Sequence, residues 1–338
     1  IANEHGYTGV FGPNLERVPE VAGQWRERLG IPHLMLVPYG WERRGTWAGI
    51  NYFPAVPSDE AWREANRALA AQGDATAFLI SGFWWVVRRA ATRNGPAFDD
   101  TADFGRRRAM VIASPDGSPW YVDNYHKVGT HGDWRGWSVA LCHGCSVARG
   151  TIEEIVLGLS ELGVPLISFD QEIGGGQVAP CYSAQHDHPP GWGAWMWRDF
   201  TNLCSAILTK AATAQRPLGL MTENCGEMII PVMASFWSRQ FGVVDHATHG
   251  DENVGLFSYL YHEYVTAIAA AMVQGQGPRM STPSPGLRAQ AMAHALVRGL
   301  IPCPFALLVP MEGPAERSPP MAQALLGFAP AYGTFPEF

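Results

Sequence analysis

Two apolar segments of this chain each end on a carboxylate. Residues 166–172 read LISFDQE and residues 218–224 read LGLMTEN, so Asp170 and Glu223 each follow a run of strand-forming residues. In a (β/α)8 barrel, side chains at the C-terminal ends of the strands face the active-site mouth. We therefore expect the two carboxylates to share one pocket, where one can act as nucleophile and the other as proton donor in glycoside hydrolysis. A helix N-cap or a buried ion pair is the alternative for each of them.

Two more acids lie close to this pair in the sequence. Glu227 follows Glu223 by four residues, which is about one helical turn, and Glu172 follows Asp170 by two. Either of them could be the proton donor, and Glu227 could instead shift the pKa of Glu223 through like-charge repulsion. The sequence alone leaves the identity of the acid open.

Aromatic and polar side chains are expected to surround the acids. Sugar rings present apolar C–H faces that stack on aromatic rings, while their hydroxyls need polar partners. The chain has 13 tryptophans, more than its core requires, although core packing remains the alternative for any single one. The predicted substrate-binding residues are Tyr39, Trp41, Trp84, His143, Gln171, His186, His188, Glu227, His246 and His262.

Metal chemistry is a weaker interpretation of the same residues. His186 and His188 form a His-x-His pair, which is found in metal-dependent barrel hydrolases, but there the pair normally sits on the first strand and here it lies in a proline-flanked loop. Cys142 and Cys145 form a C-x-x-C without a second such pair to complete a zinc site. No phosphate-binding glycine motif follows a strand. The sequence therefore predicts no metal and no cofactor, and it assigns the two histidines to sugar hydroxyls.

Strand-like runs alternate with helical stretches along most of the chain, which is typical of a parallel sheet. We predict an α/β fold, a (β/α)8 TIM barrel over residues 1–310, with residues 311–338 as a tail or the start of a further domain. Residues 94–133 interrupt the alternation and predict an inserted hairpin region after the second strand. The eight predicted strands are 33–41, 76–84, 137–142, 165–170, 218–223, 241–246, 256–262 and 300–308. The seventh is the least secure, because residues 255–273 also read as a helix.

Composition limits the classes of partner. The 338 residues are 47% hydrophobic and 16% charged, which fits a compact globular protein and not a disordered one. A net charge of −7 without a basic stripe argues against nucleic acid, and no apolar run reaches the ~20 residues that span a bilayer. The expected partner is a carbohydrate substrate. Oligomeric state and localisation stay open, with secreted, periplasmic and cytoplasmic enzymes all compatible.

Four motifs in order resemble those of a known family. The segments FDQ with CYSAQHDHPPGWG, then MTENCGEMIIP, then LFSYLYHEYV, are similar to the motif series of a bacterial family of glycoside-hydrolase-like barrels of unknown function. The resemblance covers residues 39–299. Through it the chain is distantly similar to the clan of α-galactosidases and endo-α-N-acetylgalactosaminidases.

The resemblance implies site residues as well as a fold. The nucleophile of that clan is an aspartate at the end of the fourth strand, a position that Asp170 matches. Two acids of the family's second motif are matched by Glu223 and Glu227, whereas Asn224 and Cys225 depart from the glycine and small polar residue expected there. The sequence thus favours a retaining glycoside hydrolase. A metal-dependent barrel hydrolase and a non-catalytic carbohydrate-binding barrel are the alternatives.

Overall fold

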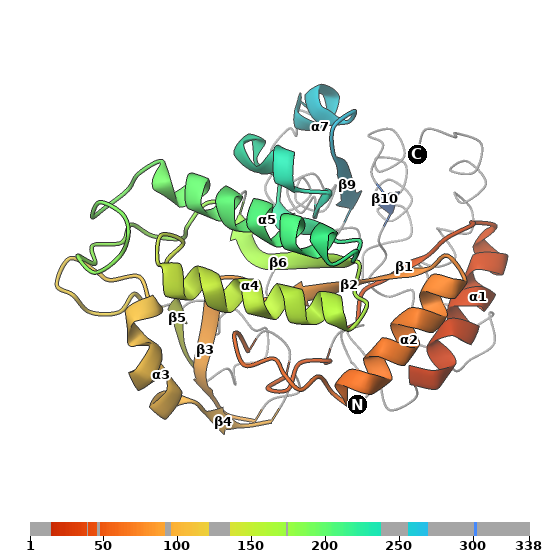
Figure 1. The fold of residues 1–338 in the computed structure, drawn as a ribbon, viewed down its shortest axis with the longest axis horizontal. Helices are drawn as coiled ribbons and strands as arrows, with labels where there is room; N and C mark the ends of the chain where they lie inside the picture. Colours follow the sequence, from red (N-terminus) through yellow and green to blue (C-terminus); the bar gives the residue numbers. More distant parts are fainter. Residues whose placement is uncertain are drawn as a thin grey trace, which may run out of the picture.

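A computed structural model describes residues 15–38, 40–45, 48–91, 96–121, 136–173, 175–237, 256–269 and 301–302. Its largest element is a seven-stranded sheet in which every neighbouring pair is parallel, in the order β1-β2-β6-β7-β8-β9-β10. The sheet curls like part of a barrel wall behind the helices (Figure 1). Its strands are β1 (Met35–Leu36), β2 (Ala75–Ile80), β6 (Leu166–Ile173), β7 (Gly219–Asn224), β8 (Ser235–Trp237), β9 (Thr266–Ala269) and β10 (Ile301–Pro302).

Each face of the parallel sheet has its own apolar cluster. Side chains of strand residues alternate between the faces. On the outer face Phe78, Phe169 and Phe236 belong to the main core, which the helices cover. On the inner face Met221 and Trp237 belong to a smaller cluster, which Leu79, Ile268 and other strand residues complete. Because both faces are buried, these strands read in the sequence as continuous apolar runs.

Four long helices contribute to the main core: α1 (Val18–Leu29), α2 (Asp59–Ala71), α4 (Ser146–Glu161) and α5 (Trp195–Thr213). The side chain of Ser58 accepts a hydrogen bond from the Ala61 N–H at 3.2 Å and so caps the N-terminus of α2. Helices α4 and α5 lie side by side in front of the sheet, while α1 and α2 pair beside β1 (Figure 1). The α/β class is therefore as predicted.

Residues 137–142 do not form a strand of the parallel sheet, so that prediction is wrong. They fall in β5 (Gly136–Ala140), which pairs antiparallel with β3 (Trp84–Arg89) in a separate sheet of order β4-β3-β5, where β4 is Phe98–Asp99. An apolar run has the same composition in either sheet, and only its hydrogen-bonding partner distinguishes them. As a result β6 is the third described strand of the parallel sheet and β7 the fourth.

Residues 256–262 are not a strand either. They begin with α7 (Leu256–Tyr261), in which Phe257 and Tyr261 lie one turn apart with ring centroids 4.9 Å from each other. The helical spacing of these rings therefore outweighed the strand propensity of the individual residues. The next described strand of the parallel sheet after α7 is β9. The predicted strand 241–246 and the tail 311–338 lie outside the described residues.

The predicted hairpin insertion is described only in part. It includes β4, α3 (Thr101–Arg107) and a 3-10 turn, η2 (Arg108–Met110). Beyond them, Ala113 and Pro119 form an isolated antiparallel bridge around Gly117, whose φ is 79°. These segments lie next to the antiparallel sheet at one end of the molecule (Figure 1).

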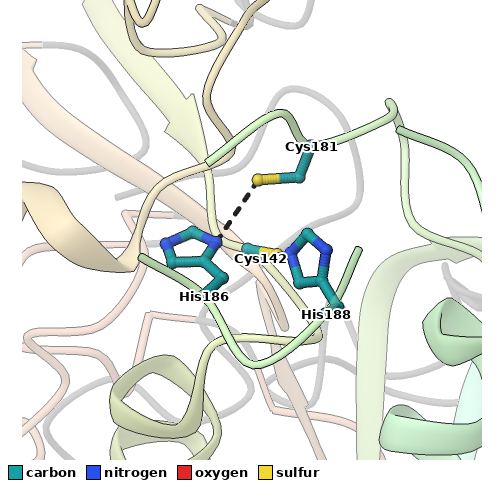
Figure 2. Close-up of side chains that lie close together, drawn as sticks. All are labelled: Cys142, Cys181, His186 and His188. Carbon is teal, nitrogen blue, oxygen red and sulfur yellow. Dashed lines mark hydrogen bonds between the residues drawn. The ribbon is translucent and has the colours of Figure 1, made fainter. Parts of the chain in front are cut away.

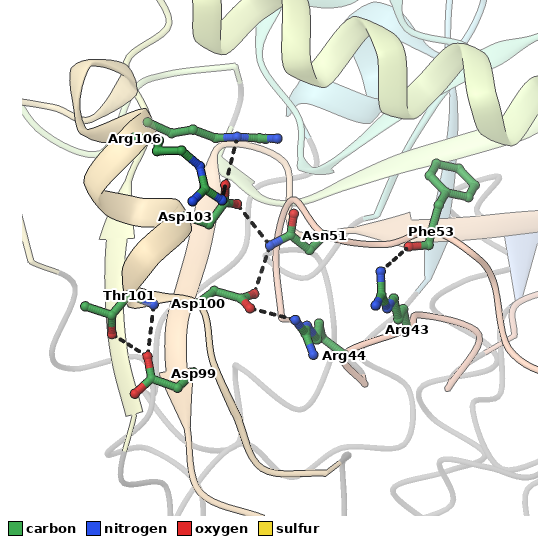
Figure 3. A network of polar contacts seen from close by, with 10 residues as sticks. Arg43, Arg44, Asn51, Phe53, Asp99, Asp100, Thr101, Asp103 and Arg106 are labelled. Atoms are coloured by element: carbon green, nitrogen blue, oxygen red, sulfur yellow. Dashed lines mark hydrogen bonds and ion pairs between the residues drawn. The ribbon is translucent and has the colours of Figure 1, made fainter.

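A buried carboxylate joins this part of the chain to the loop after β1. Asp100 accepts hydrogen bonds from Arg44 at 2.7 Å and from the Asn51 amide at 2.8 Å (Figure 3). The Asp100 side chain is 6% exposed, and the Arg44 guanidinium also lies 5.5 Å from the ring centre of Phe98. A charge with so little access to water depends on these partners.

Replacing this carboxylate should destabilise the protein. We expect Asp100→Ala to lower the free energy of unfolding by about 2 to 3 kcal/mol, because Arg44 and Asn51 would lose a buried acceptor. Urea denaturation measures the change. The control is Glu60→Ala, which breaks the exposed pair with Arg63 and should cost less than about 1 kcal/mol. Equal effects of the two variants would contradict the role given to Asp100.

Candidate active site

The ladder between β6 and β7 is irregular at the two carboxylates. Phe169 pairs with Thr222, and the next paired residues are Ile173 and Asn224. Between these pairs β6 supplies residues 170–172, whereas β7 supplies only Glu223. Two extra residues on one strand make a bulge, a feature that often lies next to active sites and re-aims side chains.

Alternation places Asp170 and Glu223 on the inner face of the sheet. Asp170 follows Phe169 and Glu223 follows Thr222, and both of these neighbours are fully buried on the outer face. One layer deeper on the inner face, the Trp237 indole N–H donates to the Ser168 hydroxyl at 2.7 Å. Asp170 is half-buried and Glu223 is 7% exposed. The structure thus brings the two predicted catalytic carboxylates to adjacent strand ends.

Two residues that the sequence analysis did not select, Tyr52 and Glu42, are electrostatically connected to this region. Tyr52 is buried, and its hydroxyl accepts a hydrogen bond from the Ser81 N–H at 2.5 Å. Burial raises the pKa of Tyr52, and the negative charges of Glu42 and Asp170 raise it further. Glu42 directly follows the predicted strand 33–41, so the strand-end argument that selected Asp170 could have found it.

Glu42 also faces a buried cation. Burial lowers the pKa of Arg89 to about 10, and the charge of Glu42 opposes this shift. Arg89 is 1% exposed and donates a hydrogen bond to the Arg44 carbonyl at 2.7 Å. The charge of Glu42 therefore acts on both Tyr52 and Arg89.

Two of the predicted substrate-binding residues are in the core. Trp41 is fully buried, with its ring centre 5.3 Å from that of Tyr52 and 4.8 Å from that of Phe78. His143 is 1% exposed and packs on Phe83 at 4.3 Å. Neither side chain reaches solvent at a sugar-binding rim in this structure.

Others lie outside the two strands that carry the carboxylate pair. Trp84 is half-buried on β3, in the antiparallel sheet. Glu227 begins the 3-10 helix η3 (Glu227–Val232), is exposed, and accepts a hydrogen bond from the Tyr261 hydroxyl at 2.8 Å. His262 is exposed and contacts the Tyr259 carbonyl through Nδ1 at 3.0 Å. Tyr39 and His246, and the side chain of Gln171, lie outside the described residues.

The two loop histidines meet two cysteines. His188 Nε2 lies 3.2 Å from the sulfur of Cys142, and His186 Nδ1 lies 3.3 Å from the sulfur of Cys181. A hydrogen bond from Cys142 lowers the pKa of Cys181, whereas burial raises the pKa of Cys142. The sequence analysis saw the histidine pair but not these partners, because Cys142 and Cys181 are far apart in the chain.

Comparison with known proteins agrees with this fold. A family model described as "Domain of unknown function (DUF6259)" matches residues 3–270. The chain belongs to the DUF6259 family. Proteins of curated function give no significant match to the sequence.

Solved glycoside hydrolases share the architecture of this DUF6259 chain. The α-N-acetylgalactosaminidase NagBb of Bifidobacterium bifidum has a TM-score of 0.58 at 14% identity, over 94% of this chain and 45% of that one. The α-galactosidase TtGalA of Thermus thermophilus has a TM-score of 0.56 at 14% identity, over 93% of this chain and 61% of that one. The maltogenic α-amylase AmyB of Thermotoga neapolitana has a TM-score of 0.57 at 9% identity, over 98% and 75%.

At these identities the similarity establishes the fold and not the activity. It confirms the resemblance found in the sequence, to a family of unknown function that is distantly similar to galactosidases and acetylgalactosaminidases. The DUF6259 chain spans about half the length of NagBb. Among the residues described, no helix combines the length and the apolarity needed to cross a membrane.

The raised pKa of Tyr52 predicts a pH dependence of stability. An unfolded tyrosine ionises near pH 10, whereas Tyr52 stays neutral in the fold, so stability is fully present below pH ~10 and falls as the pH rises above it. We expect wild type to lose up to about 1.4 kcal/mol per pH unit relative to Tyr52→Phe above pH ~10. Parallel urea titrations of both proteins at pH 8 to 11 measure the difference. A constant difference across this range would contradict the assignment.

Proposed function

We propose that this protein is a glycoside hydrolase that cleaves a carbohydrate substrate with two carboxylates, Asp170 and Glu223. The observation that carries the proposal is their position on one face of the sheet, at the ends of neighbouring strands and at a bulge. The glycosidase fold supports it. Paired acids across a scissile bond are what most glycosidases use.

Burial favours different roles for the two acids. It penalises the charged form of a carboxylate, and Glu223 is the more buried of the two. Glu223 is therefore the proton donor in this proposal, and the half-buried Asp170 is the nucleophile that attacks the anomeric carbon. Strand count does not support this assignment, because Asp170 lies on the third described strand of the parallel sheet and not on the fourth.

The strand spacing favours retention of configuration. Neighbouring strands lie about 4.8 Å apart, which suits the ~5 to 5.5 Å between the carboxyl groups of retaining enzymes better than the ~6.5 to 9.5 Å of inverting ones. In the first step Asp170 would form a bond to the anomeric carbon as Glu223 protonates the leaving oxygen. In the second step Glu223 would take a proton from the water that releases the sugar.

Turnover by single variants tests the pair. The substrates are aryl α-galactosides, α-N-acetylgalactosaminides and α-glucosides, with the β-linked counterparts beside them. Asp170→Asn and Glu223→Gln should each reduce kcat by about 10² to 10⁴-fold. The matched control is Glu161→Gln. Glu161 ends α4 and forms an exposed ion pair with Arg216, so this variant should keep full activity.

Two results would contradict the proposal. Undiminished turnover by Asp170→Asn or Glu223→Gln would remove that residue from the chemistry. Binding of sugars by folded wild type without turnover of any glycoside would favour a carbohydrate-binding barrel.

Azide rescue separates the two roles. In Asp170→Gly, azide can occupy the space of the nucleophile and attack the anomeric carbon once, so the glycosyl azide should have inverted configuration. In Glu223→Ala, azide should instead displace Asp170 from the covalent intermediate, and two displacements give retained configuration. Proton NMR of the products reads the anomeric configuration. Exchanged outcomes would mean that Glu223 is the nucleophile, and inversion by wild type would exclude a covalent intermediate.

A further inference from the structure

Four side chains with metal-binding atoms converge at one place in the described part of the chain. They are Cys142, Cys181, His186 and His188, and one ligand atom of each lies within 4.8 Å of all the others. Figure 2 shows Cys142 between the two imidazoles, with Cys181 above them. Cys142 comes shortly after β5, whereas the other three come from the long loop between β6 and α5.

The histidine rings are oriented as metal ligands are. His186 directs Nδ1 to the cluster while its Nε2 lies 2.7 Å from the Ala109 carbonyl. His188 directs Nε2 to the cluster while its Nδ1 lies 2.8 Å from the Pro189 carbonyl. A carbonyl oxygen only accepts, so each outer nitrogen carries the proton and each inner nitrogen of a neutral ring presents a lone pair. Metal-bound histidines almost always have such an outer partner.

The distances suit a small tetrahedral ion. With Zn–S near 2.3 Å and Zn–N near 2.0 to 2.1 Å, tetrahedral geometry requires nitrogen and sulfur ligands about 3.6 Å apart. The observed contacts of 3.2 and 3.3 Å are slightly shorter, so a small expansion would admit the ion. The Ala113 N–H also donates to the sulfur of Cys181 at 3.4 Å, which stabilises negative charge on that atom.

The site is built around His188. Its ring stacks on Trp195 with centroids 3.6 Å apart and planes within 10°. On another side lies Gly144, where an added Cβ would come 2.2 Å from His188 Cδ2. Only glycine leaves room for the ring in this position. Cys142 and Cys181 are fully buried, His188 is 7% exposed and His186 is half-buried, so three of the four side chains are shielded from water.

We propose that Cys142, Cys181, His186 and His188 bind one Zn²⁺ as a structural site. Two thiolates and two imidazoles are a ligand set of structural zinc, and four protein ligands leave no position for substrate or water. This reassigns His186 and His188, which the sequence analysis gave to sugar hydroxyls. It also separates the metal from catalysis.

The ion would join two segments that are distant in sequence, the one after β5 and the loop after β6. The loop after β6 already donates a hydrogen bond from the Tyr182 N–H to the Ala113 carbonyl at 2.9 Å, and the Cys142 N–H donates to the Met110 carbonyl at 2.9 Å. A metal ion at the cluster would add coordination bonds between Cys142 and the loop after β6. Because the loop leads away from the strand that carries Asp170, the site would hold one border of the proposed active site in place.

Metal content of the 338-residue chain tests the proposal. Wild type purified under reducing conditions in the presence of zinc should contain one zinc ion per chain, as measured by inductively coupled plasma mass spectrometry. Cys181→Ser and His188→Gln should lose it, whereas Cys145→Ser should retain it, because the Cys145 sulfur lies 3.5 Å from the Ala109 carbonyl and outside the four-residue cluster. Cobalt in place of zinc should give the absorption of a tetrahedral site with sulfur ligands.

A glycine pair gives a test that leaves every ligand intact. Gly144→Ala should weaken zinc binding by about 10 to 100-fold, as loss of a supporting contact does, because the methyl group displaces His188. Gly150→Ala on α4 is the control, since an added Cβ there meets no atom within 4 Å. Competition with a chromophoric chelator measures both affinities.

Three results would overturn the proposal: no zinc in reduced wild type, zinc retained in Cys181→Ser and His188→Gln, or a Cys142–Cys181 disulfide found by peptide mapping of protein that binds no metal. None of these readouts depends on glycosidase activity. The zinc site and the proposed function can therefore fail separately.

Discussion

The fold depends on apolar packing against both faces of one parallel sheet. Helices cover the outer face, where Phe78, Phe169 and Phe236 are fully buried, and strand side chains fill the inner face around Met221 and Trp237. A parallel sheet cannot leave either face to water, so the charged side chains of these strands lie toward the strand ends, while a polar side chain deeper in the sheet, Ser168, accepts a hydrogen bond from Trp237. The positions of Asp170 and Glu223 follow from this constraint, because they are the first places beyond the apolar layers where a carboxylate can stand.

In the region around the antiparallel sheet, buried hydrogen bonds and ion pairs position the loops. Loops there have little periodic structure, and specific pairs fix them: Asp100 holds Arg44 and Asn51, and Ser81 meets the Tyr52 hydroxyl. Hydrogen bonds of this kind contribute little when exposed and cost much when a buried partner is lost. A few such buried contacts therefore fix the positions of these loops.

Local pattern in the sequence was enough for the class of fold and for the placement of Asp170 and Glu223 on two strands of the parallel sheet. Apolar runs before Asp170 and Glu223 mark strand ends directly, and the same pattern located β2, β6 and β7. It failed where residues distant in the sequence determine strand pairing or burial. Nothing within residues 137–142 indicates that β3 will pair with them in antiparallel fashion, and nothing within residues 33–41 shows that Tyr52 and Phe78 will bury Trp41. The Cys and His cluster was missed for the same reason, since its members come from two separate segments.

The bulge at residues 170–172 adds two residues of backbone to β6 at the position of Asp170. Pairing is regular up to Phe169 and Thr222 and resumes at Ile173 and Asn224, so the extra backbone is taken up locally and the register before it is kept. A change in loop length at this point would therefore move Asp170 relative to Glu223 without disturbing the apolar layers on which the sheet depends.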